Sequence, residues 1–137
     1  MSRYLSFEQV YDYAGTLGDS IDVPIIIRAG NQQLPVIASV DTGASFCLFR
    51  SAIATVLGLD LTKGTHLRFR TANSAFEAYG HEVDIVALGV TTRSTVYFFA
   101  DPLINKNVLG RTGWLDRVRL AVVHHDNRLY LSPYGEN

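Results

Sequence analysis

Apolar residues along this chain fall into short runs, either continuous or alternating with polar residues, and each run ends at turn-forming residues. Alternation with a period of two is typical of half-buried strands, and a short continuous run is typical of a strand buried on both faces. Strands are therefore predicted over residues 21–28, 34–40, 46–49, 66–71, 76–88, 95–100, 108–109, 120–123 and 128–131. Pro24 restricts the first of these strands to a sheet edge, or belongs to its first few residues.

Two short segments carry a helical pattern instead. A helix over residues 52–57 is expected, capped by Ser51 and ended by Gly58. A second short helix is expected to begin at residue 112 or 113 and to carry Trp114, Leu115 and Val118. Many short strands, two short helices and no internal repeat favour a mostly β, closed or nearly closed barrel over alternating βα units.

Length and composition fit one compact domain. The chain has 137 residues, of which 47% are hydrophobic and 18% charged. The formal net charge of -1 provides no electrostatic footprint for nucleic acid or for an anionic membrane. The single cysteine, Cys47, lies in an apolar segment and is interpreted as a small core residue in a reducing compartment. Without a long apolar segment near the N-terminus, the protein is expected to be soluble and cytoplasmic.

One acidic residue interrupts this pattern at the end of an apolar strand. Residues 36–40 lead directly into Asp41-Thr42-Gly43. A carboxylate at such a position is costly to ionise unless hydrogen bonds or a proton-sharing partner compensate for lost hydration. Thr42 adds a short hydroxyl, and Gly43 lets the backbone turn tightly and lets another chain approach. The pattern indicates a carboxylate presented on a rigid turn.

About 65 residues after this turn comes Asn107-Val108-Leu109-Gly110-Arg111, an apolar pair followed by Gly-Arg. Asp41-Thr42-Gly43-Ala44 together with this later motif resembles the retroviral-type (retropepsin-like) aspartic proteases. The resemblance covers residues 21–132, leaving residues 1–20 as an N-terminal arm or strand and residues 133–137 as a C-terminal tail. It implies a closed acid-protease-type barrel with a flap hairpin, one lobe per subunit.

The resemblance also implies how the chain would act. Two neighbouring aspartates cannot both ionise, so one keeps a proton as acid while the other activates water as base. The chain has no second Asp-Thr/Ser-Gly, so the second carboxylate is expected from Asp41 of a second copy across a two-fold axis. The implied activity is that of a homodimeric aspartic endopeptidase acting on polypeptides, with no metal or organic cofactor.

Further roles follow from the family pattern. Thr42 would donate its hydroxyl across the dimer axis, Gly43 would leave room for substrate, and Ala44 suits the viral type. Val108, Leu109 and Gly110 would support the acidic loop from beneath. The flap would comprise Ala72, Asn73, Ser74, Ala75 and Phe76, and an extended substrate would pair main chain to main chain with it. Apolar pockets would be lined by Ile53, Phe69, Phe76 and Val108.

One position departs from the viral pattern. Viral enzymes hold the arginine of the Gly-Arg pair with an aspartate four residues after the catalytic one, and here that position is Ser45. Arg111 therefore needs another partner, either Asp116 or a carboxylate of the other subunit. The terminal strands of viral dimers also have no clear match in residues 1–20 or 132–137.

Other interpretations stay open at this point. Asp41 taken alone fits an ordinary acidic turn residue, and the barrel fits an inactive dimerisation or peptide-binding module or a monomeric ligand-binding protein. Residues 81–85 contain one histidine and lack the second histidine of a zinc-protease helix. His124 and His125 lie before a turn and are interpreted as a solvated strand end.

Overall fold

The structure is a computed structural model that describes residues 2–15 and 19–135. Its strands are β1 Gln9–Asp12, β2 Asp22–Ala29, β3 Gln32–Val40, β4 Leu48–Phe49, β5 Thr65–Arg70, β6 Ala75–Ala87, β7 Val90–Phe99, β8 Val108–Leu109, β9 Val118–Val123 and β10 Arg128–Pro133. The helices are α1 Ser51–Val56 and the single 3-10 turns η1 Leu61–Lys63, η2 Leu115–Arg117 and η3 His124–Asp126. None of the helices in the described ranges has the length and apolar character needed to cross a bilayer.

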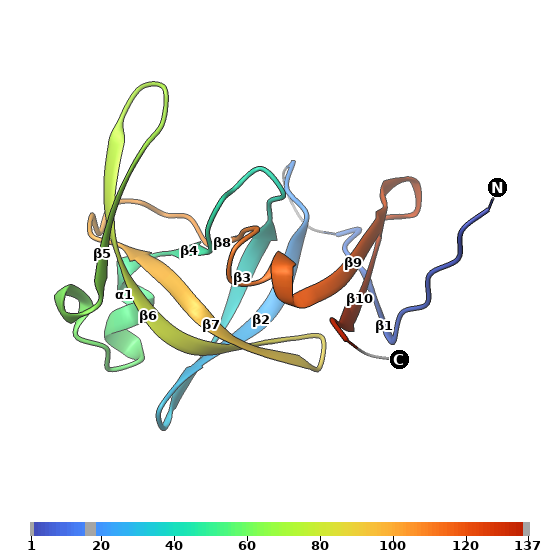
Figure 1. Ribbon diagram of the computed structural model, residues 1–137, viewed down its shortest axis with the longest axis horizontal. Coiled ribbons are helices and arrows are strands. Elements are labelled where there is room, and N and C mark those ends of the chain that lie inside the picture. The colour runs from blue at the N-terminus through green and yellow to red at the C-terminus, as the bar shows by residue number, and fades with distance from the viewer. Residues whose placement is uncertain (1, 16–18, 136–137) are drawn as a thin grey trace.

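Seven strands form one sheet that closes on itself (Figure 1). The order β2-β3-β8-β4-β7-β6 returns to its start because β6 also pairs with β2, through Ile25↔Ala87 to Arg28↔Asp84. Pro24 precedes this stretch, as expected for a residue without an N–H to donate. The predicted mostly β, closed barrel is confirmed.

The strand β6 is shared by three neighbours. It pairs with β7 from Ala78 to Ala87, while its other edge pairs first with β5 and then with β2. The β5–β6 hairpin extends away from the barrel (Figure 1). Its turn is closed by a hydrogen bond from the Thr71 N–H to the Ser74 carbonyl, 2.8 Å long. The hairpin predicted from the small polar tip is therefore present, with its second strand beginning at Ala75.

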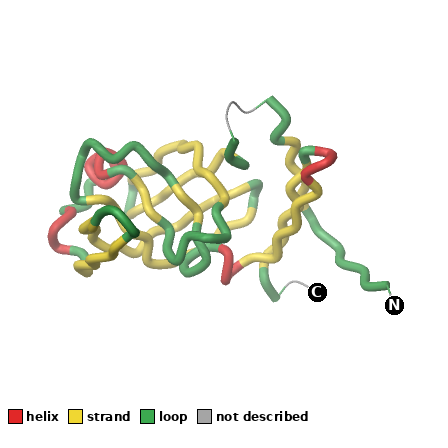
Figure 2. Tube along the Cα trace, turned by 90° about the horizontal axis from the view of Figure 1, so that it is seen from above, coloured by secondary structure: helices red, strands yellow, loops and turns green. Residues whose placement is uncertain are grey.

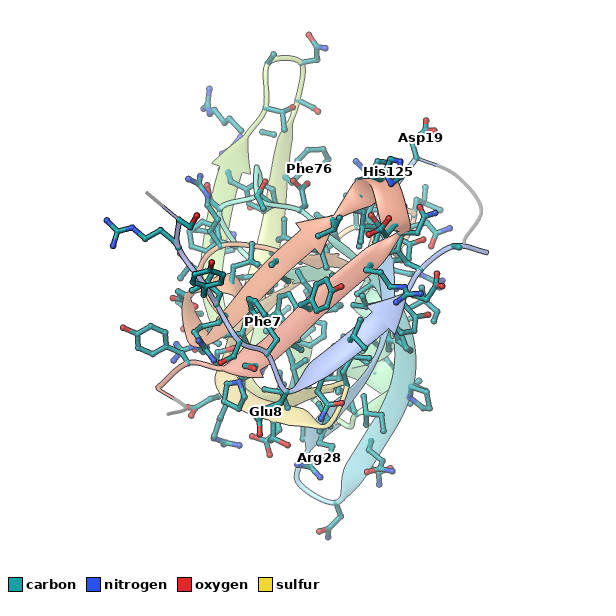
Figure 3. All side chains as sticks on the ribbon, turned by 90° about the vertical axis from the view of Figure 1, so that its right-hand side faces the viewer. Phe7, Glu8, Asp19, Arg28, Phe76 and His125 are labelled. Carbon is teal, nitrogen blue, oxygen red and sulfur yellow. The ribbon has the colours of Figure 1, made fainter. Side chains whose placement is uncertain are left out.

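The chain termini build a second, three-stranded antiparallel sheet in the order β1-β10-β9 at one end of the barrel (Figure 2). Leu129 and Leu131 of β10 are fully buried and belong to the same hydrophobic core as the barrel. Phe7 lies on the outer face of this sheet, with its ring centroid 5.9 Å from that of Tyr130 (Figure 3). The N-terminal segment is thus a short arm followed by a strand that pairs within its own chain.

The structure corrects three local predictions. β7 begins at Val90 rather than at residue 95, because the inward-facing Thr92 and Ser94 are polar and hide the alternation. Ser51 is the first residue of α1 rather than its cap; Arg50 holds the N-cap position and makes no side-chain capping bond. The second helix is only the 3-10 turn η2, and Val118 already belongs to strand β9.

Candidate active site

Asp41 is the first residue after β3, at the start of an exposed turn. Its N–H donates to the Leu109 carbonyl at 3.0 Å, and its Oδ1 accepts a 2.9 Å hydrogen bond from the Gly43 N–H. A Cβ at Gly43 would lie 3.2 Å from this Oδ1, so a side chain there would crowd the carboxylate. The turn therefore fixes one carboxylate oxygen and leaves the Asp41 side chain facing outward.

The strand β8 lies between the strands that lead into and out of this turn. It pairs in parallel with β3, through Ser39↔Val108 and Val40↔Leu109, and in antiparallel with β4, through Leu48↔Val108. Beyond β8, the Arg111 N–H donates to the Ala44 carbonyl and the Thr112 N–H to the Ser45 carbonyl, each at 2.9 Å. Backbone hydrogen bonds from β8 and the residues after it thus hold the acidic turn at both of its ends.

Gly110 allows this close approach. A Cβ built there would lie 2.2 Å from the Phe46 carbonyl oxygen and 2.9 Å from the Ala44 carbonyl oxygen. The Gly110 N–H also approaches the Cys47 sulfur, at 3.4 Å. Burial raises the pKa of the Cys47 thiol to about 11, so it remains a neutral core group beneath the turn.

Arg111 contacts the residue that replaces the viral aspartate. Its guanidinium Nη2 lies 3.5 Å from the Ser45 hydroxyl, and both side chains are exposed. Asp116, the predicted partner within the chain, instead accepts a hydrogen bond from the Gly113 N–H and lies 3.8 Å from Arg117. Of the two candidate partners of Arg111, Asp116 is therefore not the one within this chain, because its carboxylate accepts the Gly113 N–H instead.

An apolar hollow of about 390 Å³ opens beside Asp41, and we call it the phenylalanine hollow. Three rings line it: Phe69 and Phe76 from the hairpin, with centroids 5.6 Å apart, and Phe99 from the end of β7. Phe76 stands below the hairpin tip (Figure 3). Ala72, Asn73 and Ser74 at the tip and Ala75 beside it are all exposed. The arrangement supplies an apolar wall next to a carboxylate.

The sequence did not single out six of the lining residues, which are Leu48, Thr71, Phe99, Ile104, Asn105 and Lys106. Phe69, Phe76 and Val108 line the hollow as expected, but Ile53 does not: it is 5% exposed and packs in the core from helix α1. Phe99 is the buried last residue of β7 and so looks like an ordinary core residue, and Lys106 lies in a loop without a motif.

Residues 23–113 match the family described as Aspartyl protease. The chain belongs to the aspartyl protease family. Among solved structures, it is similar to a retropepsin-like aspartic protease from Rickettsia conorii, with a TM-score of 0.58 and 24% identity over 81% of this chain and 89% of that one. It is also similar to the EIAV protease complexed with the inhibitor HBY-793, with a TM-score of 0.52 and 18% identity over 69% and 85% of the two chains. The comparison with curated proteins finds no match.

The fold of this member of the aspartyl protease family is therefore that of a single retropepsin-like lobe. Within its described residues, Asp41 makes no hydrogen bond to a second carboxylate, and no three His, Cys, Asp or Glu side chains are grouped as metal ligands would be. His81 contacts the Leu61 carbonyl at 2.9 Å, and His124 contacts the Tyr13 hydroxyl at 2.7 Å. Both histidines thus take part in hydrogen bonds with residues outside the acidic turn.

Replacing Ser45 with aspartate should stabilise the acidic turn. The new carboxylate would lie beside Arg111 and turn a long hydrogen bond into an ion pair, which at an exposed site contributes about 0.5 kcal/mol. At low salt, the Ser45→Asp variant should have a higher melting temperature than Ser45→Asn, because asparagine has the shape of aspartate without its charge. The gain should vanish near 1 M salt, where the Debye length is about 3 Å. Equal melting temperatures for the two variants at low salt would show that Arg111 does not reach residue 45.

Proposed function

We propose that this chain is an aspartic endopeptidase that works as a homodimer, with one Asp41 from each subunit. The observation that carries the proposal is an exposed carboxylate on a turn held rigidly by β8, beside an apolar hollow and below a projecting hairpin. The described residues supply no second carboxylate to this turn, so a symmetry-related copy is the simplest source of one. The Aspartyl protease family match supports the reaction class.

The proposed reaction uses one proton shared by the two Asp41 carboxyl groups. The ionised carboxylate takes a proton from water as the water oxygen attacks the peptide carbonyl carbon, while the protonated partner donates its proton to the carbonyl oxygen. The tetrahedral intermediate then collapses: a proton passes to the amide nitrogen, the C–N bond breaks, and the pair again holds a single proton. The two groups titrate together, so their pKa values belong to the pair.

The other residues of the turn would position these groups. The Thr42 side chain is exposed and its hydroxyl makes no hydrogen bond within the described residues, which leaves it available to the partner's backbone. Arg111 would meet a carboxylate of the other subunit as well as Ser45. The hairpin residues Ala72 to Phe76 would close over an extended substrate through main-chain hydrogen bonds. A cytoplasmic, reducing setting is part of the proposal and is compatible with the free thiol of Cys47.

A subunit-mixing experiment tests whether the site is shared. Wild-type protein is incubated with the Asp41→Asn variant until the subunits have exchanged, and mixed pairs are counted through a tag on the variant. If each site needs both Asp41 residues, an equal amount of variant should leave about half of the wild-type activity, and a ninefold excess about one tenth. Undiminished activity at ninefold excess, where about nine in ten wild-type chains lie in mixed pairs, would show that a site does not need two Asp41 residues.

A further inference from the structure

A second hollow lies next to Asp41 and shares lining residues with the phenylalanine hollow. It has a volume of about 450 Å³, and we call it the polar hollow. The residues it shares with the phenylalanine hollow are Asp41, Asn105, Lys106 and Val108. The two hollows therefore adjoin each other along the loop before β8, with the reactive carboxylate in their common wall.

The polar hollow has few hydrogen-bond donors to offer a ligand. The hydroxyls of Ser20 and Ser39 both donate to Asp22 Oδ1, at 2.8 and 2.7 Å. The Asn107 amide nitrogen approaches the Ile37 carbonyl at 3.4 Å, and its oxygen accepts from the Arg50 N–H. Two donors lack a partner among the described residues, the amide of Asn105 and the ammonium of Lys106, and both side chains are exposed. Lys106 is the charged one of the two, and it lies in no ion pair there.

The charged side chains around the two hollows also point to Lys106. Asp41 and Lys106 are the only charged side chains among the described residues that line these two hollows. A substrate carboxylate near Asp41 would be repelled by any negative charge on the two Asp41 carboxyl groups of the proposed dimer. It would be attracted by the Lys106 ammonium. An ammonium within hydrogen-bond reach of a carboxylate forms a charge-assisted hydrogen bond, which is stronger than a bond between neutral groups.

An extended chain would present its side chains to both hollows. Successive side chains of a strand point to opposite sides, about 3.3 Å apart along the chain. A peptide that passes Asp41 would thus place one residue in the phenylalanine hollow and its neighbour in the polar hollow.

We propose that Lys106 is a specificity-determining residue, and that the preferred substrate carries a large apolar side chain next to an acidic one at the reactive centre. This proposal rests on the proposed protease function and adds the substrate class. The apolar residue fills the space between Phe69, Phe76 and Phe99, and the acidic residue meets the Lys106 ammonium.

Matched peptides test the preference. Two series carry Phe-X or X-Phe in an otherwise constant sequence, with X as Glu, Gln or Lys, and are assayed near pH 6, about two units above the pKa of a free Glu. In the series that is cleaved, kcat/KM should be about two- to fivefold higher for Glu than for Gln, the range expected for an exposed ion pair, and lowest for Lys. The preference should shrink at high salt, because an exposed ion pair is screened.

Variants at two lysines assign the preference to one side chain. Lys106→Glu should invert the ranking so that X = Lys is cleaved fastest, and Lys106→Met should bring the Glu and Gln peptides to similar rates. Lys63→Glu makes the same charge change on η1, outside both hollows, and should leave the wild-type ranking intact. Equal rates for Glu and Gln with wild type, or an unchanged ranking in Lys106→Glu, would overturn the proposal.

Binding separates this inference from the protease function. Labelled peptides are titrated into the Asp41→Asn variant, which is expected to hold them uncleaved, and their affinity is read by fluorescence anisotropy at pH 7. Tighter binding of the Glu peptide, lost in Asp41→Asn/Lys106→Met, supports the Lys106 contact even if no peptide is hydrolysed by the wild type. Cleavage without a Glu preference would instead contradict this inference while supporting the protease function.

Discussion

Replacing Asp41 with asparagine should lower kcat/KM for peptide cleavage by about 10⁴-fold or more. The amide can neither take a proton from water nor share one with its twin, and each proton-transfer role contributes about 10²–10⁴-fold. Asparagine keeps an oxygen at the position of Oδ1, which accepts the Gly43 N–H, so the turn should persist. Peptide hydrolysis under single-turnover conditions, with the melting temperature of each sample, provides the measurement.

The matched control for this prediction is Asp60→Asn. Asp60 precedes η1 and lines none of the hollows near Asp41. Among the described residues its carboxylate has one ion-pair contact, an exposed one with Lys63 at 3.8 Å. This variant should cleave as fast as the wild type. If Asp41→Asn retained wild-type kcat/KM while folded, Asp41 would not be the catalyst, and the inactive-module interpretation would become the better one.

Replacing Gly110 with alanine should cost about 3 kcal/mol of unfolding free energy. The new methyl group would overlap backbone atoms, the Phe46 carbonyl oxygen at 2.2 Å and carbon at 2.6 Å, which cannot move aside as a side chain would. Relief of the overlap requires the acidic turn and β8 to separate, so peptide cleavage should fall together with stability. Thermal or urea unfolding measures the change, and a loss of this size corresponds to about 10 °C in Tm.

Gly30→Ala is the control for the same chemical change. Gly30 lies in the β2–β3 turn with a φ of +57°, and a Cβ there would meet nothing within 4 Å. This variant should lose only about 1 kcal/mol, the usual penalty for a left-handed alanine. If Gly110→Ala were no more destabilising than Gly30→Ala, the turn and β8 would not be packed as tightly as described.

The barrel and the acidic turn could be predicted from sequence because their signals are local. The apolar run before Asp41 and the alternation of β5 and β6 follow directly from which face each residue buries. Val108 to Arg111 could be linked to the turn only through the family pattern, and the structure brings the two together through the carbonyls of Leu109 and Ala44.

What sequence could not reveal depends on contacts between distant segments. The inward-facing Thr92 and Ser94 look like surface residues until Ser94 is seen to donate to the Gly113 carbonyl at 2.6 Å. The contact between Arg111 and Ser45 spans 66 positions, and no local pattern favours it over Asp116. Lys106 likewise gains interest only from its position between two hollows.

The pairing of β1 with β10 inside a single chain bears on the order of events in assembly. Strands that already pair within their own chain need no exchange with a second subunit. Each polypeptide is therefore able to fold completely before it meets another. Association of the two folded chains in the proposed dimer is then a separate second-order step. The proposed enzyme would be inactive at low concentration and active once its concentration exceeds the dissociation constant of the pair.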